Sequence, residues 1–168
     1  MKKKRFSVKN KIKSLQQLKK IVKLIKSRGK TVVLANGCFD LLHVGHIRYL
    51  EASKRLGDIL IVAINNDRSI RAIKDPQRPI IKEKDRAEMV ASLAAVDYVV
   101  LFGEAQVDQV LLALHPDIQA KGTDYTTATI PERKIVASYG GRVAIAGDKK
   151  DHATKDLIRT ITQKYGKG

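Results

Sequence analysis

The sequence predicts an α/β fold, a doubly wound domain built on a mainly parallel sheet of five strands. Two observations predict it. Short apolar runs, many of them β-branched, alternate along the chain with segments of helical periodicity. The connections between the runs are long enough for the right-handed crossovers that join parallel strands. In such a sheet the loops that follow the strands gather at one edge, where ligands bind.

The predicted elements follow one another from Ser14 onward. Ser14 and Gln17 have the form of a capping box, which opens an amphipathic helix that ends near Gly29. The five strands are predicted at residues 31–35, 58–65, 98–102, 118–121 and 142–146. Further helices are predicted to start at about residue 44 and to cover residues 84–94, 107–114, 131–139 and 154–163. Residues 66–69 are expected to form a loop before a short basic segment at 70–74.

Positive charge is concentrated near the N-terminus. The formal net charge is +16, and residues 1–30 hold thirteen Lys or Arg and no acidic residue. The rest of the chain therefore carries a net charge of only +3. We interpret residues 1–13 as a flexible basic leader and residues 14–168 as one domain. A solvated basic face is the favoured interpretation of this charge, and a basic nucleic-acid-binding module, with salt-sensitive affinity, is the alternative.

Composition argues against several classes of protein. No apolar run reaches the roughly 18 residues that a membrane-spanning helix needs. The basic N-terminus lacks the apolar segment of a secretory signal, so a cytoplasmic location without membrane contact is expected. One cysteine cannot form an internal disulfide, and it forms no zinc-binding pattern with the four scattered histidines. No protein-held metal site is therefore predicted.

The stretch from residue 31 to 57 carries the strongest functional signal. A buried strand ends there at the turn Asn36-Gly37, and a helix follows. His43 and His46, three residues apart at the start of that helix, should lie on one face beside exposed backbone N–H groups. Anions bind readily at such a helix start, and Gly45 lets a bulky anion approach the backbone. The pattern predicts a phosphate site; the alternative is that the histidines only cap the helix.

The full motif in this stretch is Asn36-Gly37-x-Phe39-Asp40-x-x-His43-x-Gly45-His46. It resembles the signature of the nucleotidyltransferase superfamily that contains the cytidylyltransferases and pantetheine-phosphate adenylyltransferase. His-x-Gly-His alone is a weak signal, but it becomes specific with Asn-Gly-x-Phe-Asp before it and a helix after it. The resemblance implies a Rossmann-like nucleotidyltransferase fold and a reaction that transfers a nucleotidyl group.

Further motifs recur in order along the chain and narrow the resemblance. They are Asn66-Asp67-x-Ser69, Lys74 with Arg78-Pro79, Arg86-Ala87-Glu88-Met89, Ala95-Val96-Asp97-Tyr98-Val99, Lys121-Gly122-x-Asp124-Tyr125 and Tyr139-Gly140-Gly141-Arg142-Val143. Together they are similar to the adenylyltransferase domains of bacterial ADP-heptose synthases, from about Ser14 onward. That family transfers AMP from ATP to D-glycero-β-D-manno-heptose 1-phosphate, giving ADP-heptose and pyrophosphate for the lipopolysaccharide core. The alternatives within the superfamily are a glycerol-3-phosphate cytidylyltransferase and an archaeal-type FAD synthetase.

The resemblance also implies a cofactor and partners. Mg²⁺ is expected to accompany ATP, and a sugar phosphate is expected as the second substrate. In many bacteria this domain is fused to a sugar kinase. The chain has no kinase-sized segment, so we expect a free-standing enzyme with a separate heptose kinase upstream. Relatives often pair, and a homodimer is therefore an expected assembly.

The resemblance assigns roles to individual residues. His43, His46 and Lys74 are expected to be catalytic because they would hold phosphate oxygens. Asn66, Asp67 and Arg78 are expected to bind the sugar phosphate. The nucleotide is expected to be bound by Asn36, Gly37, Cys38, Phe39, Asp40, Gly45, Gly122, Asp124, His152 and Thr154.

Several of these residues also suit structural roles. Cys38 and Phe39 suit packing, and Asp40 suits an Asx turn. Lys74 and Arg78 equally suit a solvated basic loop. The stretch of residues 149–156 departs from the Ser-Thr-Thr run of the family and keeps one hydroxyl, that of Thr154. Thr154 and His152 are therefore also candidates for plain helix caps.

The expected acceptor needs no general base. A phosphate monoester is largely a dianion near neutral pH, because its second pKa is about 6. The difficulty is that two anions must meet while charge builds on the α-phosphate and pyrophosphate leaves. Positioning and stabilisation by cations and backbone donors are therefore the expected sources of catalysis.

Overall fold

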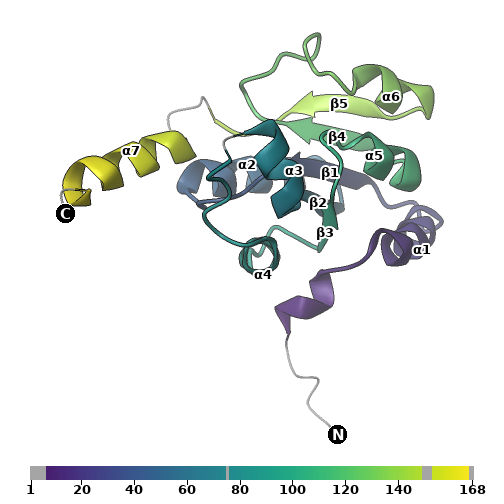
Figure 1. The fold of residues 1–168 in the computed structure, drawn as a ribbon. Helices are drawn as coiled ribbons and strands as arrows, with labels where there is room; N and C mark the ends of the chain where they lie inside the picture. The colour runs from purple at the N-terminus through teal and green to yellow at the C-terminus, as the bar shows by residue number, and fades with distance from the viewer. Residues whose placement is uncertain (1–6, 75, 149–152, 167–168) are drawn as a thin grey trace, which may run out of the picture.

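The computed structural model describes residues 7–74, 76–148 and 153–166. At its centre is a five-stranded parallel sheet in the order β3-β2-β1-β4-β5 (Figure 1). The strands are β1 (Val32–Gly37), β2 (Ile59–Asn65), β3 (Tyr98–Phe102), β4 (Ile118–Lys121) and β5 (Arg142–Ile145). The predicted doubly wound α/β fold is confirmed, and every strand pair between these five is parallel.

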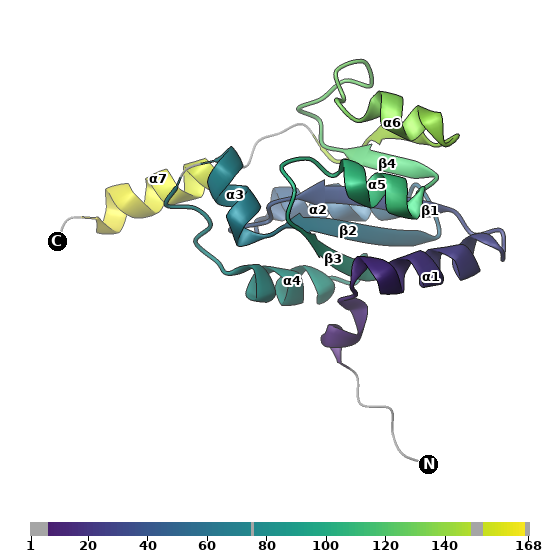
Figure 2. The same ribbon diagram turned by 45° about the vertical axis from the view of Figure 1, so that its right-hand side comes forward.

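Helices cover both faces of the sheet (Figure 2). They are α1 (Leu15–Lys26), α2 (Val44–Lys54), α3 (Asp67–Ile73), α4 (Glu83–Ala91), α5 (Asp108–Leu114), α6 (Arg133–Ser138) and α7 (Thr154–Tyr165), preceded by the 3₁₀ turn η1 (Val8–Lys11). Buried side chains of α2 and α4 pack on one face, and those of α1, α5 and α6 pack on the other. None of the described helices combines the length and the apolar character needed to cross a bilayer.

The central strand shows why the apolar runs in the sequence are continuous. Val33 and Ala35 of β1 face the layer of α2 and α4, whereas Val32 and Leu34 face the layer of α1 and α5. All four side chains are fully buried, because both faces of a parallel sheet are covered by helices. Strands of this kind lack the polar alternation that marks a half-exposed sheet.

One predicted loop is wrong. Residues 67–73 form the helix α3, and only Asn66 of the expected loop lies outside it. The Asn66 side-chain oxygen accepts a hydrogen bond of 2.8 Å from the backbone N–H of Ser69, which is the geometry of a helix N-cap. The polar residues that indicated a loop are therefore a helix start. Only Ser69 and Ile70 of α3 are buried, so the segment has too few apolar residues to show a helical period.

Residues 7–13 pack against the domain, although the sequence placed them in a flexible leader. Val8 and Ile12 lie against the core layer of α2 and α4, and Ile12 forms a parallel bridge with Val99. The backbone N–H of Lys13 donates to the carbonyl of Val99 at 2.9 Å. These contacts add a short extra edge beside β3. Residues 1–6 of the predicted leader lie outside the described residues.

Replacing Lys11 tests this packing. Its Nζ donates to the carbonyls of Val96 at 2.7 Å and Leu93 at 3.3 Å. Lys11→Met keeps the apolar stem and removes both hydrogen bonds, so the free energy of unfolding should fall by about 1 kcal/mol in urea titrations. Lys9→Met is the matched control, because the side chain of Lys9 makes, among the described residues, only an exposed ion pair with Glu88, and its loss should cost less than about 0.5 kcal/mol. Equal losses from the two variants would contradict the packing of Lys11.

Candidate active site

A cavity of about 750 Å³ opens at the edge of the sheet where the strands end. This is the edge at which a doubly wound sheet binds ligands. The loop after β1 supplies the predicted residues Asn36, Gly37, Cys38, Phe39, Asp40, His43, Gly45 and His46. The segments after β2, β4 and β5 supply the predicted residues Lys74, Arg78, Gly122, Asp124 and Thr154. Thirteen residues that were predicted from sequence thus line one cavity.

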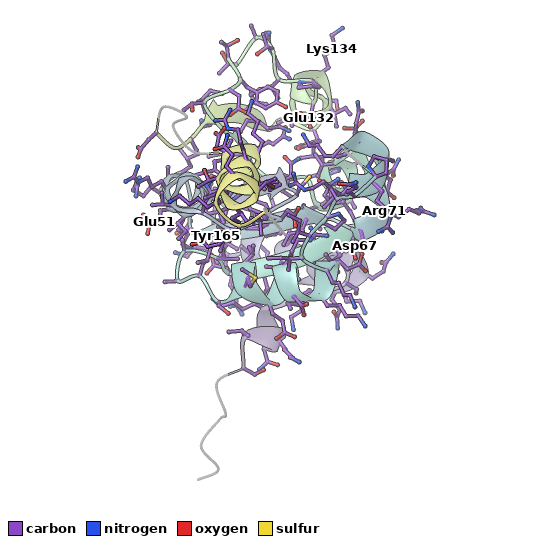
Figure 3. The ribbon with its side chains drawn as sticks, turned by 60° about the vertical axis from the view of Figure 1, so that its left-hand side comes forward. Glu51, Asp67, Arg71, Glu132, Lys134 and Tyr165 are labelled. Atoms are coloured by element: carbon purple, nitrogen blue, oxygen red, sulfur yellow. The ribbon has the colours of Figure 1, made fainter. Side chains whose placement is uncertain are left out.

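Three predicted residues are not placed there. Asn66 and Asp67 line a separate surface groove between α3 and the start of α4, with Arg71 on the same side (Figure 3). Asn66 caps α3, and the carboxylate of Asp67 accepts a hydrogen bond from Arg86 at 2.7 Å. These two side chains hold the fold next to the cavity and do not face it. His152 lies outside the described residues.

The two histidines stand together at the start of α2. Their ring centroids are 3.8 Å apart and the ring planes are 25° from parallel. His43 is the N-cap residue of α2, but its side chain makes no capping hydrogen bond. The rings instead line the cavity beside the positive end of an eleven-residue helix. The arrangement can present imidazole N–H donors and backbone dipole to an anion.

Phe39 fixes the position of this pair. Its side chain is 3% exposed and belongs to the core, and its ring centroid lies 5.2 Å from that of His46. The backbone at Phe39 has φ 48°, a left-handed conformation that a bulky residue adopts at a cost of about 1–3 kcal/mol. A Cβ at position 37 would lie 3.1 Å from the Phe39 ring, so Gly37 allows that ring to approach. Phe39 is thus a packing residue that turns the loop toward α2.

Asp40 holds the opposite wall of the cavity. Its side chain is fully buried, and it accepts hydrogen bonds from the backbone N–H groups of Ile80 and Ile81 and from Arg78 Nε at 2.5 Å. Burial alone would raise the pKa of Asp40, but those backbone hydrogen bonds and the Arg78 guanidinium outweigh it, and the pKa lies below its usual value. The carboxylate therefore stays ionised and ties the loop after β1 to residues 78–81. This is a longer-range role than the predicted Asx turn.

Arg86 is a structural residue of the site, although the sequence analysis named it only as part of a family motif and gave it no role there. Its side chain has no exposed surface, although α4 carries it near the cavity. It donates to the carbonyls of Ile81 at 2.9 Å, Cys38 at 2.5 Å and Asn65 at 2.9 Å, in addition to Asp67. A buried charge requires such partners. The sequence holds one signal for this role: Arg86 lies four positions before Val90, which places a charged residue on the buried face of α4.

A second buried ion pair lies at the end of β4. Lys121 Nζ and Glu132 Oε1 are 2.7 Å apart, and both side chains are less than a tenth exposed. Both residues line the cavity, on the side of Gly122 and Asp124. Neither residue was predicted to belong to the site, because a Lys and a Glu eleven residues apart show no local pattern.

Cys38 is unsuited to act as a nucleophile. Burial raises the pKa of its thiol, against the opposing effect of the charges on Lys74 and Arg86. The thiol therefore stays protonated near neutral pH.

Asp40→Asn tests the contact between the loop after β1 and residues 78–81. Because the folded pKa lies below the unfolded one, the stabilisation by this carboxylate is complete above the usual aspartate pKa and is lost as pH falls through the folded value. The variant should lose about 2 kcal/mol of unfolding free energy at pH 7, and its difference from wild type should narrow in acid. Asp156→Asn, which among the described residues breaks an exposed pair with Arg159, is the control and should change stability little. A pH-independent difference at position 40 would contradict the assignment.

Comparison with known proteins identifies a family whose matched residues include those of the histidine loop. A cytidylyltransferase-like domain matches residues 34–163. The chain is 44% identical over 159 residues to the bifunctional protein HldE of Syntrophotalea carbinolica, and 42% identical over 156 residues to that of Pelobacter propionicus. These matches cover 95% and 93% of this chain but 32% of each relative. The chain therefore spans about a third of the length of the relatives that it matches.

Two solved structures share the fold. The lipopolysaccharide core biosynthesis protein from Thermoplasma volcanium is 33% identical with a TM-score of 0.60, over 73% of this chain and 100% of that one. Pantoate-beta-alanine ligase from Francisella tularensis has a TM-score of 0.60 at 18% identity, over 83% of this chain and 67% of that one, and shows the fold alone. The domain match spans most of the chain and includes the histidine loop. The chain therefore belongs to the cytidylyltransferase-like family of nucleotidyltransferases.

Proposed function

We propose that this chain transfers AMP from ATP to D-glycero-β-D-manno-heptose 1-phosphate, giving ADP-heptose and pyrophosphate. The observation that carries the proposal is the stacked pair of His43 and His46 in the cavity, at the start of α2. The adenylyl group and the heptose acceptor are supported by the resemblance to ADP-heptose synthases. The similarity to the Thermoplasma volcanium protein supports the link to lipopolysaccharide core synthesis.

In the proposed reaction an oxygen of the sugar phosphate attacks the α-phosphorus of ATP. One P–O bond forms, the bond between the α-phosphorus and its bridging oxygen breaks, and pyrophosphate leaves with the electron pair. His43 and His46 hold oxygens of the triphosphate, where negative charge builds as the bond breaks. No residue needs to remove a proton, because the attacking phosphate is already a dianion.

The remaining predicted roles divide the cavity between the two substrates. Lys74 and Arg78 line it on the side of α3 and are proposed to neutralise the acceptor phosphate. Gly122, Asp124 and Thr154 line the other side and are proposed to contact the nucleotide. With one substrate on each side, the acceptor phosphate and the triphosphate of ATP are proposed to meet at the histidine pair.

Mg²⁺ is proposed to enter with ATP as part of that substrate. Within residues 7–74, 76–148 and 153–166, the structure gathers no group of three His, Cys, Asp or Glu side chains that would hold a metal. The carboxylates of Asp40 and Glu132, which line the cavity, are engaged by Arg78 and Lys121. Mg²⁺ in such sites takes most of its ligands from substrate phosphates and water, so its ligands are proposed to be mainly phosphate oxygens and water.

A pyrophosphate-release assay tests the proposed function. Purified protein with Mg²⁺ should release pyrophosphate from ATP only when the heptose 1-phosphate is added. The competing pairs are CTP with glycerol 3-phosphate and ATP with FMN. Turnover of a competing pair in preference to ATP and the heptose phosphate would reject the proposal.

His46→Asn tests the role of the histidine pair. The loss of one well-placed donor to the developing charge should lower kcat by about 10²- to 10³-fold while the Tm stays near that of wild type. His115→Asn is the matched control, because His115 caps α5 with φ 45°, a conformation that Asn tolerates, and stacks on Tyr139 away from the cavity. It should keep full kcat. A fully active His46→Asn enzyme would contradict the proposed mechanism.

A further inference from the structure

The wall of the cavity beside α5 and α6 holds the buried ion pair of Lys121 and Glu132. Residues 105–107, before α5, and Glu132, before α6, line the cavity there. Successive residues of a strand face opposite sides of a sheet, and Ala120 packs in the layer of α2 and α4. The side chain of Lys121 therefore faces the other layer, where it meets Glu132. Figure 3 shows Lys134 pointing away from α6, whereas Glu132 lies within the body of the fold.

The pair has hydrogen-bonding capacity that the described residues leave unused. Lys121 Nζ carries three N–H groups, and among the described residues it donates one hydrogen bond, to Glu132 Oε1 at 2.7 Å. The Glu132 side chain is only 7% exposed, and its buried Oε2 accepts no hydrogen bond from any described residue. A buried carboxylate oxygen without a donor is unfavourable. A ligand in the cavity that brings a donor to this carboxylate would therefore be bound more tightly.

Hydroxyl groups suit this pair better than phosphate groups do. A carboxylate repels phosphate oxygens, whereas a hydroxyl can donate to Glu132 and accept from Lys121 at the same time. Lys121 Nζ also lies 5.4 Å from the centre of the Tyr125 ring, which lines the cavity and offers an apolar face beside the two charges. Adjacent hydroxyls together with an apolar C–H face are the features of a sugar.

The position of the pair favours the acceptor sugar over the ribose of ATP. Residues 105–107, on the same wall, follow β3, and Lys74, proposed for the acceptor phosphate, follows the neighbouring strand β2. Thr154, proposed for the nucleotide, follows β5 at the opposite edge of the sheet. Lys121 comes from β4, between these groups, but its side chain points away from the layer of α2, whose first turn is proposed to hold the triphosphate.

We propose that Lys121 and Glu132 bind hydroxyl groups of the acceptor sugar and thereby set the specificity of the site for its acceptor. The inference rests on the proposed function, which supplies a sugar phosphate as the second substrate. A site built to hydrogen-bond hydroxyl groups discriminates strongly against a ligand that lacks them, because its polar groups are then left without partners.

Calorimetric titration tests this role without turnover, in the presence of the ATP analogue with a methylene group between the α- and β-phosphorus atoms. The two ligands are D-glycero-β-D-manno-heptose 1-phosphate and methyl phosphate, which has the phosphate but no sugar. Wild type should bind the heptose phosphate about 100-fold more tightly than methyl phosphate. In Lys121→Met/Glu132→Leu this preference should be lost, while the affinities for methyl phosphate and for the ATP analogue stay at the wild-type values. Replacing both residues together avoids leaving one charge buried alone.

Two further variants separate sugar binding from a structural role. Glu132→Gln keeps the size of the side chain and an acceptor for Lys121, so it should fold with the wild-type Tm and lower the preference by about tenfold, because a charge-assisted hydrogen bond is lost. Lys9→Met/Glu88→Leu makes the same two replacements in an exposed ion pair outside the cavity, and it should keep the full preference.

A wild type without preference for the heptose phosphate would overturn the inference, as would an unchanged preference in both Glu132 variants. Weaker binding of the ATP analogue alone would also overturn it, because the pair would then serve the nucleotide. Tight binding of the heptose phosphate that depends on Lys121 and Glu132, without pyrophosphate release in the turnover assay, would support the sugar-binding role and reject only the proposed reaction.

Discussion

The geometry of the candidate active site depends on the hydrogen bonds that the buried guanidinium of Arg86 makes. This guanidinium joins the end of β1 at Cys38, the end of β2 at Asn65, the start of α3 at Asp67 and the loop at Ile81. A charge with no exposed surface is tolerated only when its donors are satisfied, so these four segments must meet in one arrangement. The carboxyl edge of the sheet is therefore held by a side chain that does not face the cavity.

The charges around the cavity fall into two groups. Asp40 and Arg78 form a pair that closes one wall, and Lys121 and Glu132 form another at the end of β4. Both pairs are largely buried and keep the loops at fixed distances from one another. The histidine pair, in contrast, lines the open cavity at a helix start. A reaction between two anions is favoured by such a fixed set of donors, since no reorganisation is needed as charge develops.

Local patterns in the sequence were sufficient for the sheet and the histidine loop. Each strand is a continuous apolar run, and the Asn-Gly turn, the histidines and the following helix lie within a single stretch. The missed features depend on residues that are distant in the chain. Arg86 reaches a carbonyl 48 residues away, and Lys11 reaches one 85 residues away, so neither contact has a local signature. The helix start at Asn66 was missed for a different reason, because an N-cap and a polar turn use the same residue types.

The central claim is that the stacked imidazoles of His43 and His46 gather the phosphates of a nucleoside triphosphate. A crystal structure with an ATP analogue that carries a methylene group between the α- and β-phosphorus atoms is the most direct measurement. The account predicts phosphate oxygens within hydrogen-bonding distance of both rings and of the first backbone N–H groups of α2. Triphosphate bound elsewhere in the cavity, with both rings more than 5 Å from any phosphate oxygen, would contradict it.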